Sequence, residues 1–106
     1  MPRSAHRTTP IILYSRLYTE DDYTGTLVGS PAWFAWLDTA TTFYYQGREG
    51  TFTAHSEHRH RGRRYWIAYR RRAGVLRRCH LGKAAHLTLE RLQTVAATLN
   101  TSPSLP

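Results

Sequence analysis

The chain has 106 residues, 41% hydrophobic and 12% aromatic, which provides enough apolar material for one modest core but not for two. Its 15 lysines and arginines outnumber 7 aspartates and glutamates, and the resulting formal net charge of +8 indicates a polyanionic partner. The single cysteine, Cys79, excludes an internal disulfide and a CxxC zinc knuckle, and no apolar run approaches the length of a membrane span. We therefore expect one cytoplasmic domain.

The N-terminal segment is expected to consist of an arm and a hairpin. Residues 1–10 are polar and end in proline, so they are expected to form a flexible basic arm ahead of a single domain over 11–99. Residues 11–18 are predicted to form a strand, the acidic cluster at 20–22 a turn, and residues 26–28 a short return strand.

The next elements are a short helix and a meander of strands. Ser30 as N-cap and Pro31 at the first helical position predict a helix over 31–41. From Thr42 onward, β-forming residues are interrupted by turn signals, which divide 42–81 into four strands. The turn signals are GREG at 47–50, RGR at 61–63 and AG at 73–74.

A second helix is predicted over about 88–99, with Thr88 as N-cap and an apolar stripe that includes Leu92 and Leu99. The stripe requires a sheet face to cover. Residues 100–106 are rich in proline and serine and are expected to form a tail. The expected fold class is α+β: an antiparallel β-meander of three to four strands packed against a C-terminal helix, with one short upstream helix.

The turns predict which side chains share a face of the sheet, because residues alternate between the two faces of a strand. The AG turn places Arg70 opposite Arg77, and an even-length loop at 61–64 places Arg59 opposite Trp66. The core face beneath the C-terminal helix then collects Phe43, Tyr45, Phe52, Ala54, Tyr65, Ile67, Tyr69 and Leu76. The outer face collects Thr53, His55, Glu57, Arg59, Trp66, Ala68, Arg70, Arg72, Arg77 and Cys79.

The predicted outer face is basic and is the candidate binding surface. Like charges directly opposite each other, as Arg70 and Arg77 would be, destabilise a sheet by up to about 1 kcal/mol, and a phosphate between them would remove that cost. Arginine forks also match phosphates and guanine edges. The candidate nucleic-acid contacts are Arg59, Arg61, Arg63, Arg64, Trp66, Arg70, Arg72, Arg77 and Lys83.

Several of these residues have a plainer interpretation. Arginines also keep sheet edges from pairing, and Trp66 is either a partly buried core residue or an exposed platform for a base. Histidines at 55, 58 and 60, with Cys79 and His80, suggest a mixed zinc site, but the predicted register points His55 away from the other two. No Walker A, GxGxxG, GxSxG or HExxH pattern occurs, so neither a metal, a cofactor nor catalysis is expected.

The segment GRRYWIAYRRRAGVLRRCHLGK at 62–83 resembles the YWYAY…RYLGK segment in the N-terminal region of LuxR/MalT-type bacterial transcriptional regulators. WFAWL at 33–37 and REGTFT at 48–53 fit the same pattern, so the resemblance covers roughly 30–99. His80 stands where those segments carry tyrosine, and Cys79 where they carry a basic residue. The later strands and helix are also similar in outline to the three-stranded DNA-reading sheets of integrase arm-binding and ethylene-response-factor domains.

The resemblance implies a DNA-binding module of a transcriptional regulator, either a front module or a stand-alone relative. The composition and the predicted basic face agree in favouring duplex DNA as the partner. The alternatives are an RNA-binding module that uses the same face, and a protein-interaction module of a signalling regulator. Further domains or a second copy of the chain are the other expected partners, and a membrane is not expected.

Overall fold

The computed structural model describes residues 9–20, 22–58 and 63–100, with side chains at all of these positions except 22, 23 and 72. Most of the predicted arm, most of the predicted tail, Arg59, His60 and Arg61 lie outside these residues. The strands are β1 (Ile11–Leu13), β2 (Arg16–Thr19), β3 (Asp22–Leu27), β4 (Thr42–Gly47), β5 (Gly50–His58), β6 (Arg64–Arg72) and β7 (Val75–Gly82). The helices are α1 (Pro31–Leu37), the 3₁₀ turn η2 (Ala84–His86) and α2 (Leu89–Asn100).

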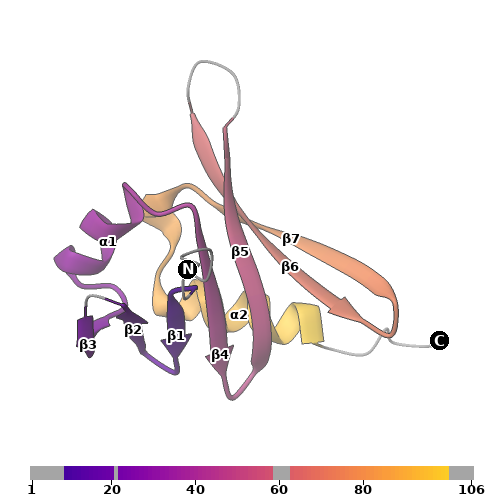
Figure 1. Cartoon of the computed structure of the whole chain (residues 1–106). Coiled ribbons are helices and arrows are strands. Elements are labelled where there is room, and N and C mark those ends of the chain that lie inside the picture. Colours follow the sequence, from indigo (N-terminus) through magenta and orange to yellow (C-terminus); the bar gives the residue numbers. More distant parts are fainter. Residues whose placement is uncertain (1–8, 21, 59–62, 101–106) are drawn as a thin grey trace, which may run out of the picture.

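All these strands form one sheet in the order β3-β2-β1-β4-β5-β6-β7 (Figure 1). Every neighbouring pair is antiparallel except β1 and β4, which run parallel. The fold is therefore α+β, as expected, but the described residues form a sheet of 7 strands rather than three to four. The predicted meander corresponds to β4–β7, and the N-terminal strands extend the same sheet from its β4 edge.

The predicted strand over 11–18 is in fact two strands joined by a tight turn. Tyr14 lies at the turn with a φ of 61°, and its N–H donates to the carbonyl oxygen of Gln46 at 2.7 Å. The turn pairs Ile12 with Leu17, so both side chains enter the core. The sequence carries no glycine or asparagine here to mark the reversal, which is why pattern alone predicted one strand.

Helix α1 begins as predicted but ends earlier than residue 41. The Ser30 side chain accepts a hydrogen bond from the backbone N–H of Trp33, and Pro31 occupies the first turn. Trp33 is fully buried, and its indole N–H donates to the carbonyl oxygen of Leu87 at 2.8 Å. This hydrogen bond ties α1 to the segment that leads into α2.

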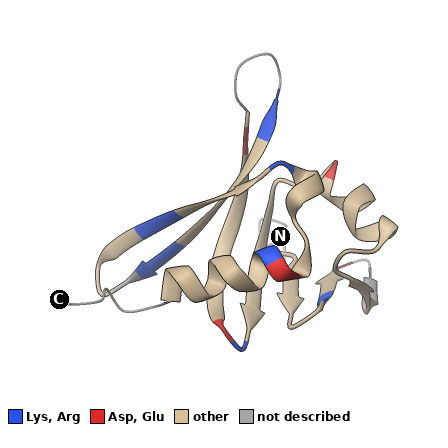
Figure 2. Cartoon of the chain, turned by 180° about the vertical axis from the view of Figure 1, so that it is seen from behind, with Lys and Arg blue, Asp and Glu red and all other residues tan. Residues whose placement is uncertain are grey.

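Helix α2 covers one face of strands β4 to β7 (Figure 2). Trp33 belongs to the same buried cluster as the α2 side chains. Thr88 caps the helix as predicted, since its hydroxyl oxygen accepts the N–H of Arg91 at 3.2 Å. The buried helix positions are Leu92, Val95, Ala96 and Leu99, which belong to the predicted stripe, while its first member, Leu89, is partly buried. They pack on Phe43, Tyr45, Phe52 and Ala54 in one hydrophobic cluster.

The predicted face assignment is wrong for β6 and β7. Trp66 pairs with Ser56, not with Arg59, and the last described pair before the connection is His58 with Arg64. The connection at 59–63 thus has an odd number of residues, whereas the predicted loop was even, and an odd shift moves every following side chain to the other face. The pairs of Tyr45 with Phe52 and Arg70 with Arg77 are confirmed, because neither depends on that loop.

The corrected register exchanges the expected core and outer residues of β6. Trp66 is 1% exposed and contacts Phe43 with ring centroids 5.2 Å apart, so it is a core residue and not an exposed platform. Ala68 and Leu81 join it beneath α2. The residues predicted to be core but placed on the opposite face are Tyr65, Ile67, Tyr69 and Leu76.

Removing the Trp66 side chain is expected to destabilise the domain strongly. We expect Trp66→Ala to lower the free energy of unfolding by about 3–5 kcal/mol, because a large buried ring is replaced by a cavity. The control Leu76→Ala, on the other face and 49% exposed, should lower it by less than about 1 kcal/mol. Urea denaturation measures both values, and similarly small values would show that Trp66 is not a core residue.

Candidate nucleic-acid interface

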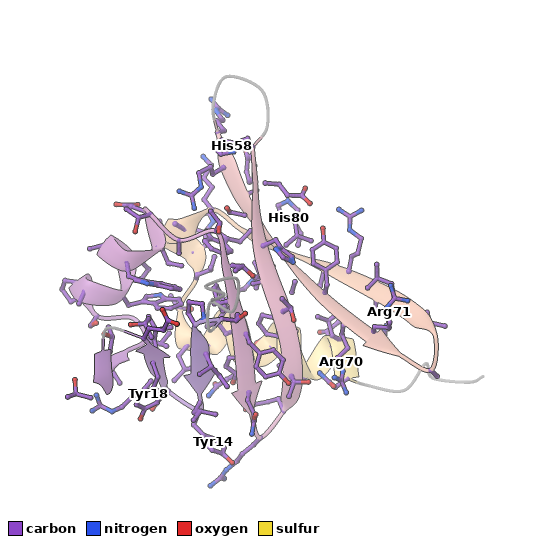
Figure 3. The ribbon with its side chains drawn as sticks, in the orientation of Figure 1. Tyr14, Tyr18, His58, Arg70, Arg71 and His80 are labelled. Carbon is purple, nitrogen blue, oxygen red and sulfur yellow. The ribbon has the colours of Figure 1, made fainter. Side chains whose placement is uncertain are left out.

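The two faces of strands β5–β7 differ in what covers them. One face lies under α2, and among the described residues no helix covers the other, which we call the open face (Figure 3). The register assigns the open face its side chains by alternation from the pairs of Thr53 with Tyr69 and Ile67 with His80. They are Thr53, His55, Glu57, Tyr65, Ile67, Tyr69, Arg71, Leu76, Arg78 and His80.

The sequence-predicted contacts are dispersed by this arrangement. Arg63 and Lys83 are exposed at the ends of β6 and β7, and the side chain of Arg72 lies outside those described. The remaining four are on the α2 side of the sheet: Arg64, Trp66, Arg70 and Arg77. The predicted contacts whose side chains the structure describes therefore do not form one continuous patch.

Arg64 is partly buried and holds the end of α1. Its Nη1 donates to the carbonyl oxygen of Asp38 at 2.7 Å, and its Nη2 donates to the carbonyl oxygens of Leu37, at 3.2 Å, and Ala40. These carbonyls lack hydrogen-bond partners within the helix. The guanidinium therefore caps the C-terminus of α1, whose carbonyl groups would otherwise be hydrogen-bonded to water. The same guanidinium lies 5.8 Å from the ring centre of Trp66. Arg64 is therefore occupied within the fold.

Arg70 and Arg77 face each other as predicted, but on the α2 side of the sheet. Figure 3 shows Arg70 beside the C-terminal end of α2. Arg70 Nη1 donates to the hydroxyl of Thr51 at 2.7 Å, and Arg77 Nη1 donates to the carbonyl oxygen of Leu99 at 3.2 Å. The C-terminal end of a helix carries partial negative charge, so two cations there are favoured. Helix α2 therefore accounts for this arginine pair without a nucleic acid.

The open face carries a network built on Tyr69. Its hydroxyl donates to Glu57 Oε2 at 2.8 Å, and this hydrogen bond raises the pKa of Tyr69. The Arg78 guanidinium lies over the Tyr69 ring, 5.5 Å from its centre, and the His55 ring meets the same ring edge-on at 5.6 Å. This contact holds the Arg78 guanidinium in place on the open face.

A second aromatic contact lies nearer the β5–β6 connection. The rings of Tyr65 and His80 are 5.7 Å apart, and between the two contacts Ile67 is only 2% exposed. The exposed basic and imidazole side chains around these two aromatic contacts are those of His55, Arg71, Arg78 and His80. Glu57 is the one carboxylate among the described open-face residues of β5–β7, and Tyr69 already donates to it.

Sequence analysis therefore missed the basic residues that the open face presents. Arg71 and Arg78 alternate with the predicted contacts Arg70 and Arg77 along the same strands. The runs RRR at 70–72 and RR at 77–78 place arginines on both faces, so pattern alone gave no preference between them. Only the register of β5 against β6 decides which arginine faces outward.

Two other sites were considered on the described residues. No three His, Cys, Asp or Glu side chains there come together in a group that would hold a metal ion. A cavity of about 550 Å³ lies at the β4–β5 turn, lined by Tyr14, Arg48, Glu49 and Gln93 among others. Tyr45 donates to Glu49 Oε1 at its edge, and burial raises the pKa of that tyrosine well above its usual range.

No described helix is long and apolar enough to cross a membrane.

Comparisons with known proteins give no family for the chain. No protein-family model matches it, no curated protein matches it, and no solved structure matches it.

The structural role of Arg64 can be separated from that of its neighbour. We expect Arg64→Ala to lower the free energy of unfolding by about 1–3 kcal/mol, because the carbonyls at the end of α1 lose a charged donor. Arg63→Ala removes the same charge from an exposed position and should change stability by less than about 0.5 kcal/mol. Equal effects of the two substitutions on thermal unfolding would contradict the capping role.

Proposed function

We propose that the chain is a nucleic-acid-binding domain that docks the open face of β5–β7 on duplex DNA. The observation that carries the proposal is the uncovered sheet face with its exposed Arg71, Arg78, His55 and His80. The net charge of +8 would favour any polyanion over a neutral partner. We propose a binding rather than a catalytic role, in the cytoplasm.

The geometry of the β6–β7 hairpin suits a groove of duplex DNA. The major groove is about 12 Å wide and admits a two-stranded ribbon, whose strands lie about 4.8 Å apart. Arg71 pairs with Leu76, two residues from Arg78 on the same face, so the two arginines are diagonal neighbours. Arg78 is held over Tyr69 and can reach a phosphate or a guanine edge with little further ordering.

The architecture adds support of a weaker kind. Strands β5, β6 and β7 followed by a covering helix are the arrangement that the likeness to integrase arm-binding sheets implies. A place in transcriptional regulation rests on the resemblance of 62–83 to the LuxR/MalT-type segment. The alternatives are RNA on the same face and a protein partner, and the polymer preference and salt dependence of binding separate them.

The two faces of the same strands provide a matched test of the docking surface. Arg71→Ala/Arg78→Ala and Arg70→Ala/Arg77→Ala each remove two positive charges from adjacent positions on β6 and β7. We expect the first variant to weaken binding to duplex DNA at least about tenfold, because it removes the outward-facing donors. Its salt dependence should also fall, by about 0.9 in logarithmic slope for each lost phosphate contact.

Fluorescence anisotropy with labelled duplex DNA across a salt series measures both effects. Circular dichroism at the assay temperature confirms that each variant is folded, since Arg70 and Arg77 also contact the rest of the structure. A larger loss for the folded Arg70/Arg77 variant would contradict docking through the open face. Tighter binding to hairpin RNA than to duplex DNA would favour the RNA alternative, and the absence of binding to either nucleic acid at low salt would favour a protein partner.

A further inference from the structure

Three tyrosines form a row across the open side of the whole sheet. The register aligns Tyr18 of β2 with Ile11 of β1, and Ile11 with Tyr44 of β4. The same row continues from Tyr44 through Thr53 of β5 to Tyr69 of β6, and ends opposite Arg78 of β7. Tyrosine therefore stands on every second strand, with a smaller side chain between. Strands lie about 4.8 Å apart, so successive rings are about 10 Å apart.

The rings in this row are not part of the hydrophobic core. All three tyrosines are partly exposed, while the buried cluster lies on the other side of the sheet. The Tyr18 ring rests on the backbone of β3: a Cβ atom added to Gly25 would meet its Cε1 at 3.0 Å. One side of that ring is thus supported by the fold. Tyr44 makes no ring contact with another described aromatic or cationic side chain.

The charge on this face changes along the row. The basic residues Arg71, Arg78 and His80 lie at the β6–β7 end. Toward β2 the face is more apolar, with the exposed Leu13 and Leu27 in register on either side of Arg16. A polyanion that is held at the basic end would therefore meet mainly ring faces and aliphatic surface, with Arg16 as a further cation, as it continues across the sheet.

Ring faces select unpaired bases. In a duplex the base faces are stacked on one another, and only a single strand can turn its bases outward onto aromatic side chains. A stacked strand advances about 3.4 Å per nucleotide, so neighbouring tyrosines would engage bases about three nucleotides apart, or fewer in an extended strand. Such contacts tolerate any sequence because every base has a flat face.

We infer that Tyr18 and Tyr44, continuing from Tyr69, form a stacking surface for an unpaired strand that flanks the duplex. The inference rests on the proposed function, since β5–β7 hold the duplex whose strand then crosses β4, β1 and β2. The nucleic acid recognised is accordingly a duplex with a single-stranded extension. Tyr44 is the central residue of the surface, because it lies between the other two tyrosines in the row.

The test compares a blunt duplex with the same duplex carrying an unpaired extension of about ten nucleotides on either end, again by fluorescence anisotropy. The wild-type protein is expected to bind one extended duplex at least about fivefold more tightly than the blunt one. Tyr44→Leu should abolish that gain without changing blunt-duplex binding, and Tyr44→Phe should retain it because the ring remains. Tyr14→Leu is the matched control, since Tyr14 is 57% exposed in the β1–β2 turn but outside the row.

The possible failures are distinguishable. If the blunt duplex binds but neither extension adds affinity, or folded Tyr44→Leu keeps the full gain, the stacking surface is refuted and the proposed function stands. If extended or single-stranded DNA binds in a Tyr44-dependent way while the blunt duplex does not bind, the stacking surface is supported and duplex docking is refuted. If neither the blunt duplex, the extended duplexes nor single-stranded DNA binds at low salt, both proposals are refuted.

Discussion

The pairing of Ser56 with Trp66 is the constraint on which the rest of the structure depends. It places the largest side chain of β6 against Phe43 and beneath α2, and every second residue of β6 and β7 follows it to that side. A register displaced by one residue would bury Arg71 and Arg78 and expose the tryptophan. Burial of Trp66 therefore stabilises the core and, by alternation, determines which arginines reach solvent.

The arginines consequently divide into two groups with different tasks. Arg64, Arg70 and Arg77 satisfy backbone or hydroxyl acceptors near the ends of α1 and α2, where the helix dipole favours positive charge. Arg71 and Arg78 lie on the open face, beside rings and histidines. A high arginine content thus serves the fold as well as the proposed ligand, and the net charge alone does not separate the two uses.

Much of this architecture could be predicted from the sequence. Ser30 and Thr88 marked the helix starts, and the AG turn fixed Arg70 opposite Arg77, because capping and two-residue turns are local. The parallel pairing of β1 with β4 could not be predicted, since it joins segments far apart in the chain. The open face of β6 and β7 was predicted wrongly because one residue more or less in the connection moves every following side chain to the other face. The residues at 59–63 do not indicate where the β5–β6 pairing ends.

The most direct test of DNA docking through the open face is an amide chemical-shift titration of the labelled protein with a short DNA duplex at low salt. Docking through the open face should perturb residues on β5–β7 around His55, Arg71, Arg78 and His80, while the exposed side of α2 around Thr94 and Thr98 stays unchanged. Perturbations concentrated on α2, or none at saturating duplex, would contradict it.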